Sequence, residues 1–349
     1  MVTIGADLHK RWHTAVAVDE QGRKLAERTV RATPGGHLEL RAWAERWTER
    51  RWALEDCRHL SRRLEGDLVR AGETVVRVPP KLMAEVRRSS REPGKSDPID
   101  ALAVARAALH EPDLPTARLD GVEREVRLLV DHRDDLVAER TRAQNRLRWH
   151  LHELSPGDEP VARSLDRYHV LAALETRLAE LSGVVARIAA DLVVRIRDLT
   201  RTIEGLEREI ARLVARLAPT LLALQGCGPL TAAKLVGEVA GIGRFRSAAA
   251  FARYDGTAPV PVWSGNQTRH RLNRGGNRQL NVALHRIAIT QLQRPGKGQD
   301  YLAKRMAGGD TKTEAIRLLR RRISDEVYRR MLSDEASRAA RQEPVAMAA

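Results

Sequence analysis

Four carboxylates in the first hundred residues have the type and spacing that bind divalent metal ions. Asp7 lies in GADLHK, Glu55 in WALEDC, and Asp97 and Asp100 in KSDPIDALAVARA. The last two are three residues apart at an expected helix start, so both project from one face. Oxygen ligands of this kind suit Mg²⁺, and two such ions roughly 4 Å apart stabilise the attacking and leaving oxygens of a phosphoryl transfer. We therefore interpret these four residues as catalytic ligands of Mg²⁺ or Mn²⁺ at a site that cuts phosphodiesters.

Each of these carboxylates also has an ordinary structural explanation. Asp97, with Pro98 after it, suits the N-cap of a helix, and an aspartate at a strand end is often a turn residue. Glu55 is followed by Asp56, which competes for the same role. The joint placement of the four favours the metal interpretation, because it puts them at the ends of a first and a fourth strand and at the start of a later helix.

The surrounding segments predict a small α/β domain over residues 1–115. Alternating apolar residues indicate strands near 2–10, 13–20 and 24–32 in an antiparallel meander, and further strands near 50–56 and 73–80. Helices are expected over about 37–50 and 60–71 and from Asp97 onward. This element order is that of the ribonuclease-H-like fold. Gly5 lies on the same side of its strand as Asp7, and we expect its missing side chain to leave room for a substrate backbone.

The charge balance favours a polyanionic partner, and a solvated basic surface is the alternative. The formal net charge is +15 and the pI is near 10.6. No run of about 18 apolar residues is present, and MVTIGADLHKRW lacks the order of a signal peptide, so we expect a cytoplasmic protein without a membrane span. The two cysteines, Cys57 and Cys227, exclude a cysteine-based zinc site and suit a reducing compartment. Aromatic residues make up only 3%, so phosphate contacts should dominate nucleic-acid binding.

Residues 116–217 are predicted to be helical. An amphipathic helix is expected from Glu123 to Leu154, and its second half, from Arg140 to His152, contains many arginines and little acid. Arg140 and Arg146 are therefore candidate contacts to a phosphate backbone or to RNA. The alternative is a solvated helix whose charges balance one another.

A heptad pattern follows that helix and predicts a coiled coil about 70 Å long. Its apolar positions are 171, 174, 178, 181, 185, 188 and 192, and then 196, 199, 203, 206, 210, 213 and 217. The extra step of four after Leu192 is a stutter. The preceding helix can fold back against this stripe, but our preferred partner is a second copy of the chain, in a homodimer or homotetramer.

Residues 218–332 are predicted to form a mainly α-helical C-terminal domain. LLALQGCGPLTAAKLVGEV has helix-hairpin-helix spacing, and Gly226 and Gly228 would let a DNA backbone approach closely. A glycine-rich helix connection without a ligand is the alternative. The later stretch SGNQTRHRLNRGGNRQL suits a phosphate-binding surface, and Ser264 is expected in an exposed loop there. A basic helix over about Thr313–Leu332 should close the domain, with a frayed tail at 333–349.

The motifs GADLHK, ALED and KSDPIDA together resemble those of the insertion-sequence one-ten family of DEDD transposases, whose N-terminal domain resembles the Holliday-junction resolvase RuvC. The resemblance covers roughly residues 1–332. Ser264 matches a serine that follows a proline-containing segment in that family. The basic stretch that follows the serine there is matched by Arg274, Gly275, Gly276, Asn277 and Arg278. Many relatives carry a lysine soon after the serine, whereas this chain has Asn266 and Gln267.

The resemblance implies a recombinase in which Ser264 attacks a DNA phosphate and forms a covalent phosphoserine intermediate. It also implies donor and target DNA as substrates and a bridge RNA as guide. His9 and Lys10 match the positions that follow the first aspartate in the family, where a basic residue is a phosphate contact or mere surface charge. Because Ser264 is far from Asp100 in the sequence, one chain's carboxylates and another chain's serine are a further possible arrangement.

Two alternatives compete with this interpretation. The first is a RuvC-like junction endonuclease that uses water, with Ser264 as an ordinary loop residue. The second is a non-catalytic coiled-coil protein that binds nucleic acid, with the carboxylates as helix caps and turn residues.

Overall fold

The computed structural model describes residues 1–55, 59–80, 82–83, 86, 96–111, 114–119, 121–161, 163–264, 267–271, 273 and 275–346. The chain forms two compact units. The mixed unit comprises Met1–Gly121, Ala223–Gly226 and Val239–Ala349, and the helical unit comprises Val122–Leu222 and Cys227–Glu238. No helix in the described part of the chain is long and apolar enough to cross a membrane.

A five-stranded sheet organises the N-terminal part of the mixed unit. Its strands are β1 (Val2–Leu8), β2 (Trp12–Val18), β3 (Lys24–Arg31), β4 (Arg50–Glu55) and β5 (Val75–Val78), in the order β3-β2-β1-β4-β5. The first three strands pair antiparallel, and β4 and β5 run parallel to β1. The element order expected for a ribonuclease-H-like fold is therefore present.

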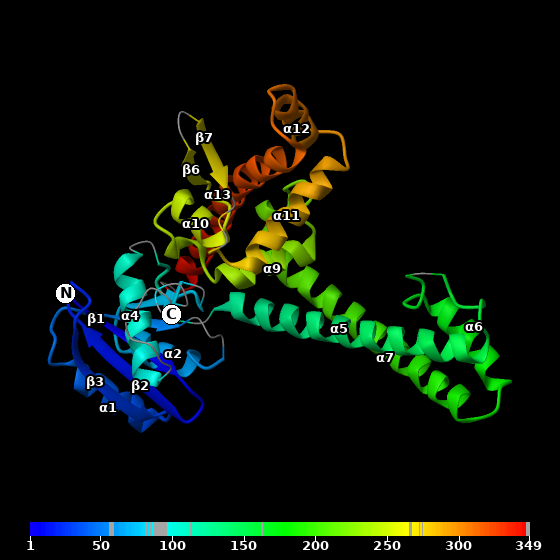
Figure 1. Ribbon diagram of the computed structural model, residues 1–349, viewed down its shortest axis with the longest axis horizontal. Helices are drawn as coiled ribbons and strands as arrows, with labels where there is room; N and C mark the ends of the chain where they lie inside the picture. Colours follow the sequence, from blue (N-terminus) through cyan, green and yellow to red (C-terminus); the bar gives the residue numbers. More distant parts are fainter. Residues whose placement is uncertain are drawn as a thin grey trace. The chain divides into compact units, whose positions relative to one another are not determined.

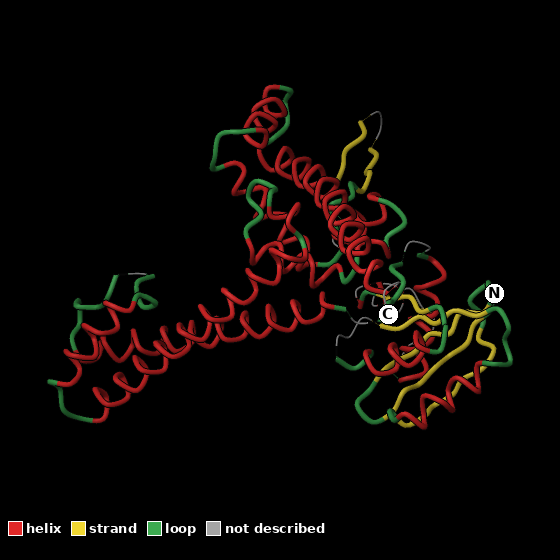
Figure 2. Tube along the Cα trace, turned by 180° about the vertical axis from the view of Figure 1, so that it is seen from behind, coloured by secondary structure: helices red, strands yellow, loops and turns green. Residues whose placement is uncertain are grey.

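Helices cover both faces of this sheet (Figures 1 and 2). On one face, Ile4, Ala6 and Leu8 pack with residues of α1 (Pro34–Ala44) and α2 (Arg62–Arg70). On the other face, α4 (Asp97–His110) packs through Ala101 and Val104. Because strand side chains alternate between faces, odd-numbered residues of β1 point toward α4.

Gly5 is needed for the packing of α4 rather than for a substrate. A β-carbon on Gly5 would lie 2.8 Å from the Cα of Ala105 and nearer still to the carbonyl oxygen of Ala101. The expectation that Gly5 leaves room for a substrate backbone is therefore wrong, because the α4 backbone already fills that space. The same close approach brings the start of α4 near the end of β1.

The helical unit contains α5 (Val122–Leu154), α6 (Tyr168–Ala179) and α7 (Val184–Leu217). The expected continuous helix over 171–217 is interrupted between α6 and α7, where Gly183 adopts a φ of 105°. The α5 helix packs along α7 in antiparallel orientation, with Arg133 Nε 2.9 Å from Glu207 Oε1 and Arg195 Nε 3.1 Å from Glu139 Oε1. The stripe of α7 is thus covered within one chain.

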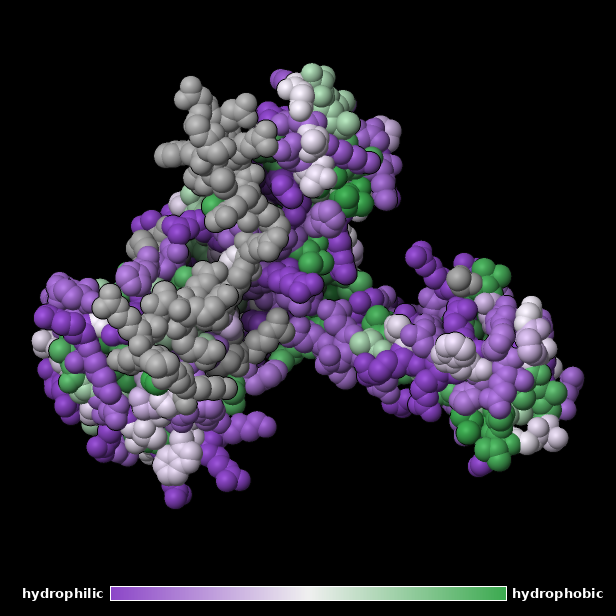
Figure 3. Space-filling view, in the orientation of Figure 1, coloured by the Kyte–Doolittle hydropathy of each residue, from purple (hydrophilic) through white to green (hydrophobic). Residues whose placement is uncertain are grey.

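Burial confirms that α5 takes the place assigned to a second chain. The seam residues Leu192, Ile196, Leu199 and Ile203 are buried in the single chain. A second copy is therefore not required to cover the seam, although self-association stays a prediction. Exposed apolar residues remain where α6 joins α7, at Leu181 and Val184, and hydrophobic surface is visible at that end of the unit (Figure 3).

The segment expected to form a helix-hairpin-helix contains a first helix of only four residues, α8 (Pro219–Leu222), followed by α9 (Pro229–Val239). The hairpin motif therefore stays a prediction. The rest of the C-terminal region contains the short 3-10 helix η1 (Ile242–Arg244), α10 (Ala248–Asp255), the hairpin β6 (Val260–Ser264) and β7 (Gln267–Arg271), α11 (Arg278–Leu292), α12 (Lys297–Ala307) and α13 (Lys312–Ala346).

The expected frayed tail after residue 333 is wrong, because α13 continues to Ala346. The carboxylate of Glu335 on this helix accepts hydrogen bonds from the backbone nitrogens of Ile242 and Gly243, at 2.8 and 3.1 Å. It also pairs with Arg118 at 3.1 Å. These contacts hold Glu335, which lies in the segment expected to fray, against η1 and Arg118.

Candidate metal centre

Asp7 and Glu55 emerge at the same edge of the sheet. Strands β1 and β4 are parallel neighbours in which Gly5 pairs with Ala53 and Ala6 with Leu54. Asp7 and Glu55 are the next residues of each strand. Ala53 packs on the α4 side of the sheet, so Glu55, two residues later, faces that side as Asp7 does.

The start of α4 supplies the other two carboxylates. Ser96 is the N-cap of this helix, with extended backbone angles, so the alternative that Asp97 is the cap does not hold. Asp97 begins the helix, and the backbone nitrogen of Asp100 donates to the Ser96 carbonyl at 3.0 Å. Asp100 is buried, whereas the Asp97 side chain is half exposed. A carboxylate oxygen of Asp97 lies within 4.8 Å of one of Asp7, so the end of β1 and the start of α4 meet.

His9 completes the cluster and was not predicted as a ligand. Its Nε2 lies 3.1 Å from Asp7 Oδ2 and 3.3 Å from Asp97 Oδ1. One ligand atom from each of Asp7, His9 and Asp97 lies within 4.8 Å of the others, so the three can hold a metal ion together. The sequence signal was available, because His9 follows Asp7 by two residues, but it was interpreted only as a phosphate contact or surface charge.

The electrostatics of Asp7 fit a cation-binding site. Burial raises the pKa of the Asp7 carboxyl above its ordinary value, His9 opposes that rise, and Asp100 and Asp97 add to it. Ionised Asp7 is therefore held in a place where its charge is unfavourable. A divalent cation would offset both the burial and the repulsion, so the residues present fit a divalent metal ion.

Ser264 is the last residue of β6 and pairs with Gln267 across the hairpin. It was expected in a loop, and it stands instead at the point where a strand ends. Of the two residues that depart from the family pattern, Gln267 begins β7 and Asn266 lies outside the described residues.

The residues before β6 are fixed by a buried carboxylate that sequence reasoning missed. Asp255 at the end of α10 is fully buried and accepts hydrogen bonds from Ser324 Oγ at 2.5 Å and from Thr257 Oγ1 at 2.6 Å. Burial raises its pKa to about 6, and the hydrogen bonds from Ser324 and Thr257 limit the rise. These contacts attach the start of the serine-bearing hairpin to α13.

The glycine and asparagine candidates have structural roles. Gly226 adopts a φ of 86°, and a β-carbon there would lie 2.8 Å from the carbonyl oxygen of Ile287 on α11. A β-carbon on Gly276 would overlap the backbone nitrogen of Gly256. Asn277 caps α11 by accepting from Gln279 and Leu280 nitrogens, at 2.9 and 3.1 Å. Their assignment as nucleic-acid contacts stays a prediction.

The remaining basic candidates differ in exposure and in hydrogen bonding. Arg140 donates to Thr200 Oγ1 of α7 at 3.2 Å, so its guanidinium connects α5 to α7 within the helical unit. Lys10, Arg146 and Arg278 are exposed, as is Gly228, which has open space around it. Arg274 lies outside the described residues.

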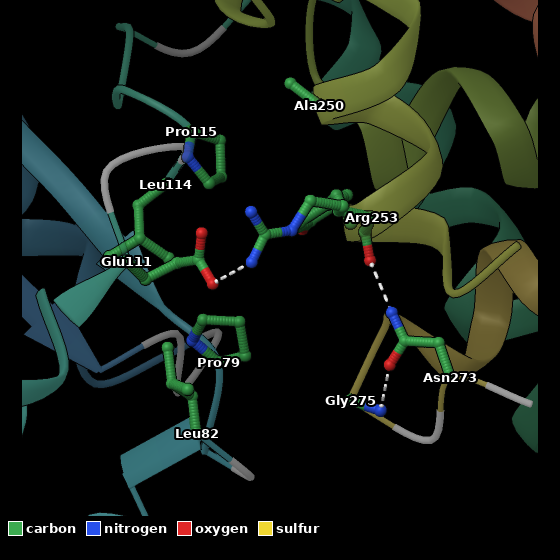
Figure 4. A pocket seen from close by; sticks show the side chains of 10 residues that line it. Pro79, Leu82, Glu111, Leu114, Pro115, Ala250, Arg253, Asn273 and Gly275 are labelled. Carbon is green, nitrogen blue, oxygen red and sulfur yellow. Dashed lines mark hydrogen bonds and ion pairs between the residues drawn. The ribbon is translucent and has the colours of Figure 1, made fainter. Parts of the chain in front are cut away.

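An ion pair connects the region after α4 with α10. Glu111 follows the end of α4, and its Oε2 lies 2.7 Å from Arg253 Nη2 (Figure 4). The pair crosses a cavity of about 190 Å³ whose walls include Pro79, Leu114 and Asn273. It attaches the helix that carries Asp97 and Asp100 to the helix that leads into β6.

Comparisons with known proteins give the family. A family described as transposase matches residues 4–156, and the transposase IS116/IS110/IS902 family matches residues 218–303. The uncharacterized 44.8 kDa protein of insertion element IS116 from Streptomyces clavuligerus is 31% identical, over 96% of this chain and 95% of that protein. The uncharacterized 43.6 kDa protein of insertion element IS110 from Streptomyces coelicolor is 30% identical, over 73% of this chain and 75% of that protein.

A further relative and one solved structure are more distant. The uncharacterized 42 kDa protein of insertion element IS900 from Mycobacterium paratuberculosis is 26% identical, over 96% of each chain. T. thermophilus RuvC in complex with a Holliday junction substrate matches 34% of this chain and 99% of its own, at 16% identity and a TM-score of 0.27. The matches that span nearly the whole length show that the chain belongs to the IS116/IS110/IS902 family of transposases, enzymes that act on DNA.

Proposed function

We propose that this transposase cuts and rejoins DNA with a divalent ion, Mg²⁺ or Mn²⁺, held by Asp7, Glu55, Asp97 and Asp100, and with Ser264 as its nucleophile. The observation that carries the proposal is the convergence of these carboxylates at one edge of the sheet, where Asp7 and Glu55 share a face with the start of α4. Carboxylate oxygens grouped in this way suit Mg²⁺ or Mn²⁺, and such ions assist phosphoryl transfer.

The chemistry assigns separate tasks to the two sets of residues. Ser264 Oγ forms a bond to phosphorus as the bond from phosphorus to one deoxyribose oxygen breaks. The hydroxyl proton passes to a base, and the leaving oxygen takes up a proton. A bound divalent ion would polarise the phosphate and stabilise its developing negative charge. Serine is too weakly acidic to attack unaided, so its hydroxyl needs a base or a bound metal ion, and we propose that the carboxylate cluster supplies the metal ion.

A covalent-capture experiment tests this proposal. End-labelled DNA carrying the element's own termini is incubated with the protein and Mg²⁺ or Mn²⁺ and then run on a denaturing gel. We expect a protein–DNA adduct from the wild type and none from Ser264→Ala or Asp97→Asn. Ser337→Ala, which changes an exposed serine on α13, is the matched control and should keep the adduct.

Hydrolysis by water is the alternative that the same experiment decides. A RuvC-like endonuclease would release cut DNA without attached protein, and Ser264→Ala would cut at the wild-type rate. Full cleavage by Ser264→Ala would therefore end the serine mechanism while leaving the metal centre in place. The non-catalytic alternative does not fit membership of a transposase family.

We propose donor and target DNA and a guide RNA as partners, in line with the family resemblance and the net charge of +15. Exposed Arg146 on α5 is a candidate contact. Sequencing the RNA that copurifies with the protein tests the guide. The proposal is supported if a non-coding RNA segment of the element is enriched with the wild type and depleted with Arg146→Glu. It is contradicted if both proteins recover the same bulk RNA.

Self-association and a site shared between two chains complete the proposal. The exposed apolar residues Leu181 and Val184 at one end of the helical unit support self-association, since the seam itself is covered by α5. Mixing Ser264→Ala with Asp7→Asn protein tests sharing, because a shared site recovers cleavage from two inactive chains. No recovery in a mixture that forms mixed oligomers contradicts it.

A further inference from the structure

We propose that His9 is a ligand of the metal centre and makes that centre select Mn²⁺ over Mg²⁺. The inference rests on the proposed metal site and adds a residue and a selectivity to it. Its basis is that His9 Nε2 lies between two carboxylate oxygens from different elements, Asp7 at the end of β1 and Asp97 at the start of α4.

The distances fit ligation. In an octahedral site with bonds of about 2.1 Å, neighbouring ligand atoms stand about 3 Å apart. His9 Nε2 lies 3.1 Å from Asp7 Oδ2 and 3.3 Å from Asp97 Oδ1. The imidazole therefore already stands at the separation that adjacent ligands of one ion need, and small shifts of the side chains suffice to place an ion among the three.

The backbone holds His9 in this place. Strand β1 ends at Leu8. The backbone nitrogen of His9 donates to the Trp12 carbonyl at 3.0 Å, and this bond closes the turn into β2. The imidazole is about half exposed, so an ion has access to it from solvent. A surface histidine paired with one carboxylate would be ordinary, whereas contact with two carboxylates that are themselves gathered at the site is not.

The donor atom determines the selectivity. Mg²⁺ prefers oxygen ligands and keeps its water molecules, whereas Mn²⁺ and later divalent metals accept an imidazole nitrogen more readily. A site built from carboxylates alone would favour Mn²⁺ weakly. A nitrogen from His9 adds binding energy for Mn²⁺ and little for Mg²⁺, so the ratio of the two affinities is the property that His9 controls.

The full-length protein without DNA is suitable for the test, and binding of the ions themselves is the readout. Mn²⁺ affinity is measured by electron paramagnetic resonance and Mg²⁺ affinity by calorimetry, for wild type, His9→Ala and the control His132→Ala, which removes an exposed imidazole from α5. We expect His9→Ala to lower the affinity for Mn²⁺ by at least about tenfold, because even residues that only orient a ligand contribute that much to metal affinity. Mg²⁺ affinity should change much less.

Pulsed paramagnetic resonance gives a second readout that a structural role would not affect. Bound Mn²⁺ in the wild type should show coupling to an imidazole nitrogen, and this coupling should vanish in His9→Ala and persist in His132→Ala. Absent nitrogen coupling in the wild type, or higher metal affinity in His9→Ala, would overturn the inference, because His9 would then only occupy the site until an ion displaces it. If the wild type binds neither ion, both the role of His9 and the proposed metal centre are contradicted.

Discussion

Gly5 on β1 lies against Ala105 on α4 so closely that a β-carbon on Gly5 would stand 2.8 Å from the Ala105 Cα. Real side chains do not tolerate such a distance to backbone, so α4 would have to move. The same helix carries Asp97 and Asp100, and the same strand carries Asp7. The position of the carboxylates relative to one another therefore depends on a glycine that binds nothing.

The substitution Gly5→Ala should both destabilise the protein and weaken metal binding. We expect a loss of about 3 kcal/mol in the free energy of unfolding, at the upper end for overpacking a core. Urea denaturation measures the loss, and Mn²⁺ titration measures the binding. Gly35→Ala is the control, because a β-carbon there meets open space in the first turn of α1. Equal stability of the two variants would show that α4 adapts without cost.

A second prediction concerns the cost of keeping Asp7 charged. Because burial and neighbouring carboxylates raise the pKa of Asp7, its charged form disfavours folding when no cation is present. Asp7→Asn should therefore raise the melting temperature of metal-free protein near neutral pH and abolish the further rise on adding Mn²⁺. Thermal scans with and without Mn²⁺ measure both effects.

Asp19→Asn is the contrasting control for that experiment. Hydrogen bonds from Arg23 and Gln21 hold the pKa of Asp19 below its ordinary value, so loss of its charge should lower the melting temperature. The response to Mn²⁺ should stay as in the wild type. A destabilised Asp7→Asn variant would mean that the carboxylate contributes more to folding than burial takes away.

The sequence predicted the parts of this fold that have a strong local signal. Alternation in β1 and β4 indicated which residues share a face, and Asp97 at a helix start indicated where α4 begins. The closeness of His9 to Asp97 carries no such signal, since it depends on how α4 crosses the sheet. Reasoning from residue types also gave Gly5 a substrate role that packing explains better.

The helical region shows a different limit. The heptad stripe correctly identified buried positions such as Leu192 and Ile196, but a stripe does not say which helix covers it. The heptad spacing continues across Gly183, so it gave no sign that the chain reverses direction between α6 and α7. Asp255 was missed because a single aspartate in ARYDG does not reveal that α13 closes over it.

The intrachain seam leads to a third prediction. Ile196→Ala should cost about 2–5 kcal/mol, the usual range for truncating a fully buried isoleucine. Val194→Ala, two residues earlier and 44% exposed, should change stability far less. Because α5 covers the seam within one chain, the loss in Ile196→Ala should not vary with protein concentration. Denaturation at two concentrations tenfold apart checks this, and a marked dependence would restore the second chain as the seam's partner.

A fourth prediction follows from the buried pair His13 and His37. Their rings stack at 5.3 Å, and His37 Nδ1 pairs with Asp67 at 2.5 Å. Burial, with His37 nearby, lowers the pKa of His13 to about 4 from its ordinary 6.5. The unfolded chain therefore binds a proton before the folded one does, so stability is full above pH 6.5 and is lost as the pH falls toward 4.

Comparison with His13→Gln isolates this effect from the other titrating groups. The stability difference between wild type and variant should shrink by about 1.4 kcal/mol per pH unit below 6.5, to a total on the order of 3 kcal/mol. Urea denaturation at pH 7.5, 5.5 and 4.5 measures it. A difference that stays constant over this range would show that His13 is protonated in the folded protein as readily as in the unfolded one.

The last prediction concerns Asp255, whose pKa has the opposite effect. Burial raises it to about 6, so the folded chain holds the proton more tightly than the unfolded one. Its contribution to stability is therefore full below pH 3.8 and is lost as the pH rises through 6.

Ser324→Ala removes one hydrogen-bond donor to the Asp255 carboxylate and should cost about 1–3 kcal/mol of stability. The loss should be larger at pH 8 than at pH 5, because the charged carboxylate needs that donor more. Ser333→Ala, at an exposed position on the same helix, should cost little at either pH. If denaturation shows an equal loss for Ser324→Ala at both values, Asp255 is neutral throughout, and its hold on the residues before Ser264 does not depend on charge.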